Sequence, residues 1–470
     1  MTPPNMRLVM ASFCLLLACC DDDGDAVPQG PLPQGSAGGP AHGSGSVPNA
    51  EPTYWSDMAP LFAEHCVRCH ADGGIAPFRL DDYSQAKSFA MPIERVTRER
   101  IMPPWSVKSD GSCGEFKDSE ALSDAEIELV ARWVKGGAPE GEKRTVARPA
   151  AGPSLSDALE YMTPDFQPQI QGGELAENDE YRCFALDAPS DPTFITGYEV
   201  VPGTPEIVHH VAVLLVDPNA KTELDDAPER TNGEQMRALD DESPDRDGWS
   251  CYGMAGEGLT IVASPVVWAP GQGVVTYPND SGVALRPEYK IVVQVHYNLA
   301  DEKNRGKRDS TALRLQTAKQ VENIGIFALQ DEFLDTLFDD NGPATLPAGS
   351  ASALYQWTAS GEEIGMEGLS EAKLYGVMPH MHQLGHKYTM TVRQPGDDER
   401  CAAQVDNWDF HWQRMYFYEQ PWTIGPGTEI SVTCDFDTSS VNQPVKPGWG
   451  TRNEMCLATL YFTVPASISH

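Results

Sequence analysis

The sequence predicts a multidomain protein in which a small all-α domain precedes two all-β sandwich domains. Three observations lead to this prediction. With 470 residues, the chain is too long for one typical domain. Residues 51–145 contain patterns typical of short helices. From about residue 175 onward, the chain consists of short β-rich runs separated by Pro, Gly, Asn and Asp.

The first residues are typical of an export signal. An apolar run from Leu8 to Ala18 follows one Arg and is too short to cross a bilayer. The stretch LLAC, which ends at Cys19, resembles a bacterial lipobox, with Cys20 as a weaker alternative. We therefore expect a signal peptide over residues 1–18 and a lipid-modified Cys19; an ordinary secretory signal is the other interpretation. Both export the chain, to the periplasm or the outer membrane, where cysteines can pair.

Residues 19–50 predict a flexible linker. From residue 26 to residue 50 the chain has no charged residue and consists largely of Pro, Gly, Ser, Ala and Gln. The formal net charge of −35 argues against nucleic acid and anionic membrane surfaces as partners, because both would repel the chain. Membrane contact is therefore expected only through a lipid anchor.

The clearest helix of the small domain is predicted near its end. Ser123 and Glu126 have the spacing of a capping box, and apolar residues follow at helical intervals. A Gly-Gly pair and Pro139 predict where this helix stops. We place the small domain at residues 51–145.

The same domain contains the order Cys66-x-x-Cys69-His70, in the stretch EHCVRCHADGG. In an exported protein this order is typical of covalent haem attachment, in which two thiols bind the haem and the His reaches the iron. A structural thiol pair is the alternative. The sequence thus predicts a cytochrome c-like domain with one haem c. A later Met would be the sixth ligand; Met102 is our first choice and Met91 the alternative.

Five histidines lie on or beside predicted strands. His380 and His382 alternate along one strand, so they share a face and can bind one metal. His209 and His210 are adjacent and should point to opposite faces; binding one metal then requires a distorted strand or different ring nitrogens. His296 lies on the polar face of its strand. A lone strand His is usually an ordinary surface or core residue, but five in three motifs favour metal binding.

This set of motifs resembles the copper type II, ascorbate-dependent monooxygenases, the family of peptidylglycine α-hydroxylating monooxygenase and dopamine β-monooxygenase. The resemblance covers about residues 175–465. It implies two jelly-roll β-sandwich domains with one copper each, which face each other across a solvent-filled cleft. We place these copper domains at residues 175–315 and 316–470, after a linker at 146–174.

The resemblance also implies which residues bind the two copper ions. A His-His pair and a later His in a QVHY strand hold the electron-transfer copper, here His209, His210 and His296. A His-x-His pair and a distant Met hold the oxygen-binding copper at the catalytic site, here His380, His382 and Met455. Three imidazoles suit copper that cycles between Cu(I) and Cu(II), whereas two imidazoles and a thioether favour Cu(I).

Disulfide bonds are expected in the copper domains. The resemblance implies a bond between Cys434 and Cys456, which would fix the strand that carries the copper Met. Cys183 and Cys251 are expected to form a second bond. Two further cysteines could be free or could bridge the modules: Cys113 and Cys401.

The substrate pocket differs from that of the peptide-amidating members of the family. Met378 stands where those enzymes have an Arg that anchors a peptide carboxylate, and Thr459 stands where they have a Tyr. Together with Leu457, these residues predict a more apolar pocket. We expect a neutral or apolar small molecule rather than a glycine-extended peptide.

The expected function is that of a copper-dependent monooxygenase, which uses O₂ to hydroxylate a C–H bond of a small organic substrate. The fused haem would relay electrons to the first copper site, and an external donor, ascorbate-like or a periplasmic redox protein, would supply them. The alternative is an exported haem and copper protein that transfers electrons or binds copper without hydroxylase activity.

Overall fold

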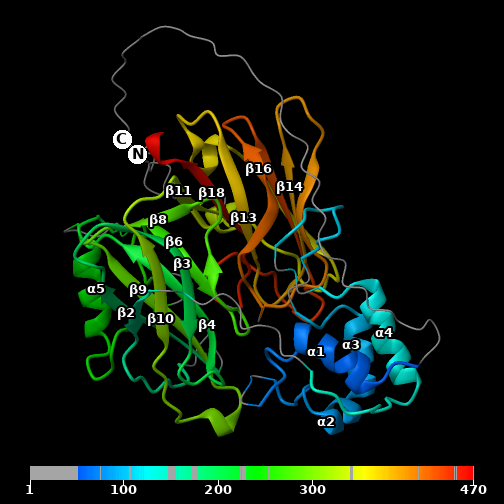
Figure 1. Ribbon diagram of the computed structural model, residues 1–470. Helices are drawn as coiled ribbons and strands as arrows, with labels where there is room; N and C mark the ends of the chain where they lie inside the picture. Colours follow the sequence, from blue (N-terminus) through cyan, green and yellow to red (C-terminus); the bar gives the residue numbers. More distant parts are fainter. Residues whose placement is uncertain are drawn as a thin grey trace.

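The computed structural model describes residues 51–468 apart from short gaps (Figure 1). The gaps are residues 73, 75, 105–106, 118, 120, 147–154, 156, 172–177, 223, 225–228, 252–254, 339–341, 411, 449 and 451. The expected signal peptide, Cys19 and the flexible linker lie outside the described residues, as does part of the linker at 146–174.

The N-terminal segment, residues 51–146, contains five short helices: η1 (Tyr54–Met58), α1 (Ala59–His65), α2 (Tyr83–Ser88), α3 (Ala90–Arg98) and α4 (Asp124–Lys135). The predicted helix with a capping box is confirmed as α4. Ser123 Oγ accepts a hydrogen bond from the Glu126 backbone N–H, and the Glu126 carboxylate accepts one from the Ser123 N–H. The helices pack around Tyr54, Phe62 and Trp133, which are almost completely buried.

The expectation of a cytochrome c-like all-α domain in front of the sandwiches is wrong. The molecule is mostly β-sheet, and the N-terminal segment is not a self-contained helical unit. Between α3 and α4 the chain runs along the C-terminal strands, where Val107 and Phe116 form β-bridges to Val405 and Tyr418 (Figure 1). Both side chains are buried in the core of the C-terminal sandwich. The segment therefore has a small core among its own helices and also contributes apolar side chains to the core of the C-terminal sandwich.

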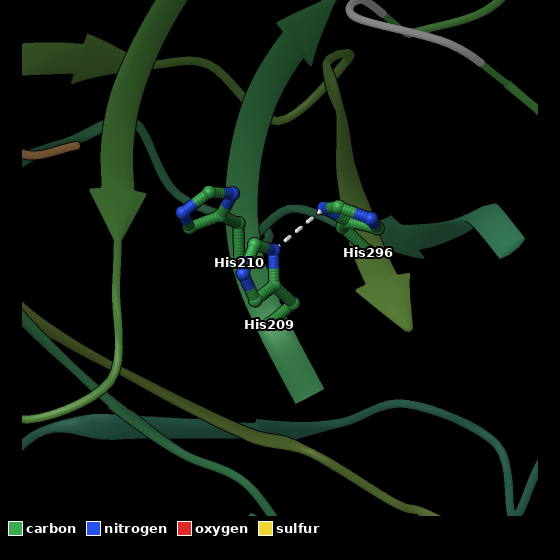
Figure 2. A group of neighbouring side chains, drawn as sticks. All are labelled: His209, His210 and His296. Atoms are coloured by element: carbon green, nitrogen blue, oxygen red, sulfur yellow. Dashed lines mark hydrogen bonds between the residues drawn. The ribbon is translucent and has the colours of Figure 1, made fainter. Parts of the chain in front are cut away.

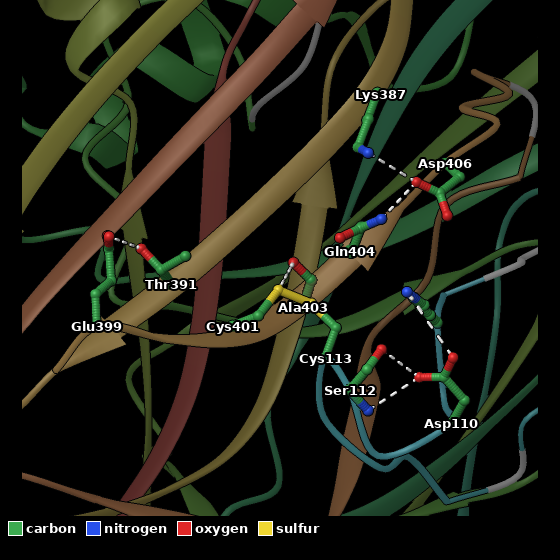
Figure 3. The surroundings of a disulfide bond; sticks show 11 residues. Asp110, Ser112, Cys113, Lys387, Thr391, Glu399, Cys401, Ala403, Gln404 and Asp406 are labelled. Atoms are coloured by element: carbon green, nitrogen blue, oxygen red, sulfur yellow. Dashed lines mark hydrogen bonds and ion pairs between the residues drawn. A yellow bond between two sulfur atoms is a disulfide. The ribbon is translucent and has the colours of Figure 1, made fainter.

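A disulfide bond between Cys113 and Cys401 joins the same stretch to β15 (Arg400–Val405) (Figure 3). Beside it, Asp110 accepts hydrogen bonds from the backbone and side chain of Ser112. These two cysteines therefore bridge the modules, which is one of the two outcomes that the sequence left open.

The β-strands of the described residues form three sheets. A five-stranded sheet has the order β5-β2-β9-β4-β6, and a four-stranded sheet has the order β12-β17-β14-β15. A nine-stranded sheet runs β1-β10-β3-β8-β11-β18-β13-β16, with β7 beside β3.

The strands have the following residue ranges in chain order. In the N-terminal half they are β1 (Leu159–Met162), β2 (Asp179–Asp187), β3 (Thr193–Val201), β4 (Val208–Val216), β5 (Trp249–Ser250), β6 (Ala263–Trp268), β7 (Val275–Thr276), β8 (Ser281–Leu285), β9 (Lys290–Asn298) and β10 (Ala312–Ala318). In the C-terminal half they are β11 (Asn323–Gln330), β12 (Ala353–Ser360), β13 (Ala372–His380), β14 (Gly385–Arg393), β15, β16 (Tyr416–Ile424), β17 (Glu429–Phe436) and β18 (Leu457–Pro465).

The nine-stranded sheet connects two β-sandwiches. Its first four strands in space, β1, β10, β3 and β8, share a core with the five-stranded sheet. Its last four strands in space, β11, β18, β13 and β16, share another core with the four-stranded sheet. The parallel pairing of Asn323 in β11 with Ser281 in β8 joins the two parts. The expected domain boundary after residue 315 falls within β10, and the chain enters the C-terminal sandwich at β11.

Few helices accompany the sheets. They are α5 (Asn232–Asp241), α6 (Glu332–Asp335) and the single turns η2 (Glu302–Asn304), η3 (Thr336–Phe338), η4 (Glu362–Met366) and η5 (Ala466–Ile468). Within the described part of the chain, no helix has the length and apolar character needed to cross a membrane. Two further disulfide bonds join Cys183 to Cys251 and Cys434 to Cys456, the two pairs expected from the sequence.

Candidate metal sites

The His209–His210 pair lies at a β-bulge in β4. Val208 pairs with Tyr297 of β9 and His210 pairs with His296, so that His209 is the extra residue of the bulge. A bulge bends the strand and redirects a side chain. This is the distortion that adjacent histidines need in order to approach one metal ion, and Figure 2 shows the ring of His209 between those of His210 and His296.

The three rings form a compact cluster, the first histidine site. Nδ1 of His209 lies 3.2 Å from Nδ1 of His296. One nitrogen of each ring, including His210, lies within 4.8 Å of the others. Imidazole nitrogens bind first-row metal ions at about 2.0 Å, which puts two ligands of one ion about 3.3 Å apart. The geometry of the described residues therefore suits a single metal ion.

His296 is held by its neighbours in β2. Its ring is 1% exposed and stacks on Tyr181, with ring centroids 4.0 Å apart and planes 12° apart. Asp179 Oδ2 lies 3.4 Å from Nε2, which makes no hydrogen bond to the described residues. A carboxylate on this side favours a proton on Nε2 and leaves Nδ1 to the metal.

His380 and His382 form the second histidine site, at the end of β13. Their rings are nearly perpendicular, with centroids 5.1 Å apart. Nδ1 of His380 donates a hydrogen bond to Oε1 of Gln413, and Nδ1 of His382 donates one to the Asn453 carbonyl oxygen at 2.9 Å. Because these oxygens only accept, each Nδ1 carries the proton and each Nε2 has a free lone pair.

Both rings of the second site are neutral at physiological pH. Burial lowers the pKa of His380 to about 4. Burial, and then the neighbouring His380, lower the pKa of His382 to about 3. A neutral imidazole is the form that binds a metal ion.

Met455 lies just before β18 and is 2% exposed. The preceding residue, Glu454, ties it to the second site, because the Glu454 carboxylate accepts hydrogen bonds from the backbone N–H groups of His382 at 2.8 Å and Leu384 at 2.7 Å. Burial raises the pKa of Glu454 to about 8. The Cys434–Cys456 disulfide holds the other side of Met455.

Phe410 contacts both histidine sites. Its ring centroid lies 6.4 Å from that of His210 and 5.8 Å from that of His382, nearly perpendicular to each. Phe410 is 8% exposed. A packed ring therefore lies where the family resemblance implied a solvent-filled cleft. Sequence reasoning missed Phe410, Gln413 and Glu454; the first two lie in a loop without a motif, whereas the acidic neighbour of Met455 was a visible signal.

The haem-type motif lies at the end of α1, where Cys66 is the C-cap residue. Cys66 and Cys69 are half-buried. Nδ1 of His70 donates a hydrogen bond to the Phe78 carbonyl oxygen at 3.0 Å, which leaves Nε2 as the unprotonated nitrogen. Met102 follows α3 and is half-buried, whereas Met91 is 68% exposed on α3.

The residues expected in the substrate pocket lie beside the second site. Met378 in β13 pairs directly with Thr459 in β18, and His380 pairs with Leu457. Thr459 and Leu457 are buried. A separate cavity of about 100 Å³ lies behind Gln413, between the N-terminal segment (Ile101 and Pro104) and the C-terminal sandwich.

Comparison with known proteins gives a family match for the C-terminal sandwich. Residues 354–469 match the family model of the copper type II ascorbate-dependent monooxygenase, C-terminal domain. The C-terminal sandwich thus matches a copper monooxygenase domain. This segment contains His380, His382 and Met455, and it also contains Phe410 and Gln413.

Curated relatives extend the similarity toward the N-terminal sandwich. DBH-like monooxygenase protein 1 of Mus musculus is 25% identical over 221 residues, 46% of this chain and 36% of the relative. Tyramine beta-hydroxylase of Caenorhabditis briggsae is 22% identical over 344 residues, 69% of this chain and 53% of the relative. Human dopamine beta-hydroxylase is 22% identical over 362 residues, which are 74% of this chain and 52% of the relative. The matched part of the chain spans about a third to a half of these relatives.

Similarity to solved structures is weak. The structure of allantoicase matches with a TM-score of 0.16 and 10% identity, over 60% of this chain and 77% of that one. The three disulfide bonds fit an exported protein, because such bonds persist in oxidising compartments.

Proposed function

We propose that this protein is a copper-dependent monooxygenase that uses O₂ to hydroxylate a C–H bond of a small organic substrate. The observation that carries the proposal is the packing of two histidine clusters with different ligand chemistry against one side chain, Phe410. The match of the C-terminal sandwich to a copper monooxygenase domain supports it.

The first histidine site would hold an electron-transfer copper through His209, His210 and His296. The cluster offers three imidazoles and no thioether, a set suited to copper that changes between Cu(I) and Cu(II). The bulge in β4 and the stack of Tyr181 on His296 fix these rings in advance of metal binding. Little reorganisation would then accompany each electron.

The second site would hold the oxygen-binding copper through Nε2 of His380, Nε2 of His382 and the sulfur of Met455. Copper there would supply O₂ binding and one-electron chemistry. The protein's contribution is orientation: Gln413 and the Asn453 carbonyl hold the two ring protons away from the metal. Glu454 joins the His382 turn to the Met455 strand by hydrogen bonds.

We further propose that Cys66, Cys69 and His70 hold a covalently bound c-type haem that relays electrons to the first site. Nε2 of His70 is suited to an iron, since its Nδ1 donates to Phe78. Arg68 within the motif donates a hydrogen bond to the Gly271 carbonyl at 3.2 Å, just after β6. The end of β6 pairs with β4 next to His210, so a relay from the motif to the first site would be short. Met102 is the proposed sixth ligand.

The substrate is proposed to be a small neutral or apolar molecule that binds near Met378, Leu457 and Thr459. The names of the relatives refer to dopamine and tyramine, so small aromatic amines belong in the first screen. Ascorbate or a periplasmic redox protein would be the external donor. A lipid anchor at Cys19 would hold the protein in the bacterial cell envelope.

The first experiment measures copper and haem in protein that matures in a host competent for c-type haem attachment. We expect two copper ions per haem, and one in His380→Ala. Incubation with ¹⁸O₂ and candidate substrates should then give a product that contains ¹⁸O. One copper or none in the wild type would overturn the monooxygenase proposal and favour an exported electron carrier.

The relay has a separate test. Cys66→Ala combined with Cys69→Ala should abolish hydroxylation with a reduced cytochrome as donor and leave hydroxylation with ascorbate unchanged. Equal loss of activity with both donors would count against a relay, because the variant would then have damaged the copper sites or the fold.

A further inference from the structure

Phe410 belongs to a turn between β15 and β16 that contacts each metal site. We call residues 408–413 the bridging turn; the structure describes all of them except residue 411. Trp408 Nε1 donates a hydrogen bond to the His382 carbonyl oxygen at 3.1 Å. Gln413 accepts from His380 through Oε1 and donates through Nε2 to the Phe410 carbonyl oxygen at 2.7 Å. The turn is therefore anchored to both histidines of the second site.

The ring of Phe410 extends from this turn to the other sandwich. His210 lies in β4 of the five-stranded sheet and His382 follows β13 of the nine-stranded sheet, two sheets that share no strand pairing between these elements. A route along the backbone from one histidine to the other would pass through many residues. Through Phe410 the two imidazoles are linked by two ring contacts.

We propose that Phe410 is the electron-transfer contact between the two metal sites, an inference that rests on the proposed copper function. With copper bound at both sites, one electron would pass from the first site, oxidised from Cu(I) to Cu(II), over His210, Phe410 and His382 to the second site, reduced from Cu(II) to Cu(I). The phenyl ring has no exchangeable proton, so protons reach the second site by a different route. The ring of Phe410 is 8% exposed, so packed side-chain atoms rather than water lie between His210 and His382.

The test measures electron transfer directly in copper-loaded, half-reduced protein. Carbon monoxide binds Cu(I) and holds the electron at the site with an open position. After a light flash releases the carbon monoxide, the electron moves to the Cu(II) of the other site, so the number of Cu(II) ions stays constant. The change from the Cu(II) spectrum of one site to that of the other gives the rate of transfer along the same contact in the reverse direction. Haem absorption, recorded in parallel, shows any electron that goes to the haem. The variants are Phe410→Leu, which removes the ring, and Phe410→Tyr, which keeps it. Phe327→Leu is the matched control, because Phe327 is equally exposed at 8% and packs against Tyr461 instead.

We expect Phe410→Leu to slow the transfer several-fold while copper content and the EPR spectra of both sites stay unchanged. Phe410→Tyr and Phe327→Leu should transfer at the wild-type rate. A wild-type rate in Phe410→Leu with both copper ions bound would overturn the role of Phe410 and leave the proposed function standing. Loss of a copper ion in Phe410→Leu alone would also overturn it, in favour of a role in metal binding. Fewer than two copper ions in the wild type would overturn both proposals.

Discussion

Cys113 and Cys401 form a disulfide bond across 288 residues of sequence and so attach the N-terminal segment to the C-terminal sandwich. Replacing both by Ala should cost about 2–5 kcal/mol of stability, because the reduced chain gains conformational freedom when unfolded. Thermal unfolding would measure the loss, and limited proteolysis should cut the chain between α3 and α4 sooner. Ser112→Ala, an exposed neighbour, is the control. An unchanged melting temperature and cleavage pattern would show that the β-bridges alone hold the segment.

Gln413 is expected to control copper affinity at the second site. Gln413→Leu removes the acceptor of the His380 Nδ1 proton, and loss of such a partner typically weakens metal binding about 10–100-fold. Competition with a copper chelator would measure the affinity. Gln404→Leu serves as control, since the Gln404 amide donates to Asp406 and not to a metal-site histidine. Equal affinities in both variants would contradict the orientation role.

Met455 is expected to contribute its sulfur and not only its volume. Met455→Leu keeps a buried apolar side chain of similar size, so the fold should lose less than about 1.5 kcal/mol. The X-ray absorption spectrum of the Cu(I) protein should lose its copper–sulfur contribution, while the first site keeps its copper. A spectrum identical to that of the wild type would mean that this Met is a core residue without a ligand role.

The buried carboxyl of Asp331 is expected to make the protein less stable as the pH rises. Burial raises the pKa of this carboxyl from 3.8 to about 7, although it accepts hydrogen bonds from the Leu334 and Cys456 N–H groups. Between pH 3.8 and about pH 7 the folded protein binds more protons than the unfolded chain. The copper-free protein should therefore lose stability as the pH rises through this range. The loss is on the order of 1 kcal/mol per pKa unit.

Urea unfolding of the copper-free protein at a series of pH values would measure this slope. Asp331→Asn cannot ionise and should remove the part of the slope that Asp331 contributes. Glu454, whose pKa is raised from 4.5 to about 8, contributes over an overlapping pH range, so part of the slope should remain. Asp191→Asn removes an exposed carboxyl and should leave the slope unchanged. A slope in Asp331→Asn equal to that of the wild type would show that Asp331 is ionised in the folded protein.

Several features could be predicted because their signals lie within a few residues of each other. The capping box of Ser123 and Glu126 predicted α4, since a helix start depends on groups three positions apart. The alternation of His380 and His382 predicted a shared face, because successive strand residues alternate. The resemblance then connected these local patterns to histidines and cysteines farther along the chain, including the pair Cys434 and Cys456 that the structure joins.

The tertiary structure alone decided the features that depend on contacts between distant residues. The bulge that makes His209 a neighbour of His296 arises from the register between β4 and β9. The prediction of a separate helical domain was wrong because Val107 and Phe116 find their apolar partners in a sandwich that is formed by residues hundreds of positions later. Phe410 has no motif, and its role follows from where two sheets meet. The sequence by itself thus determined which ligand types the chain offers, whereas packing between distant segments decided how those residues are held and connected.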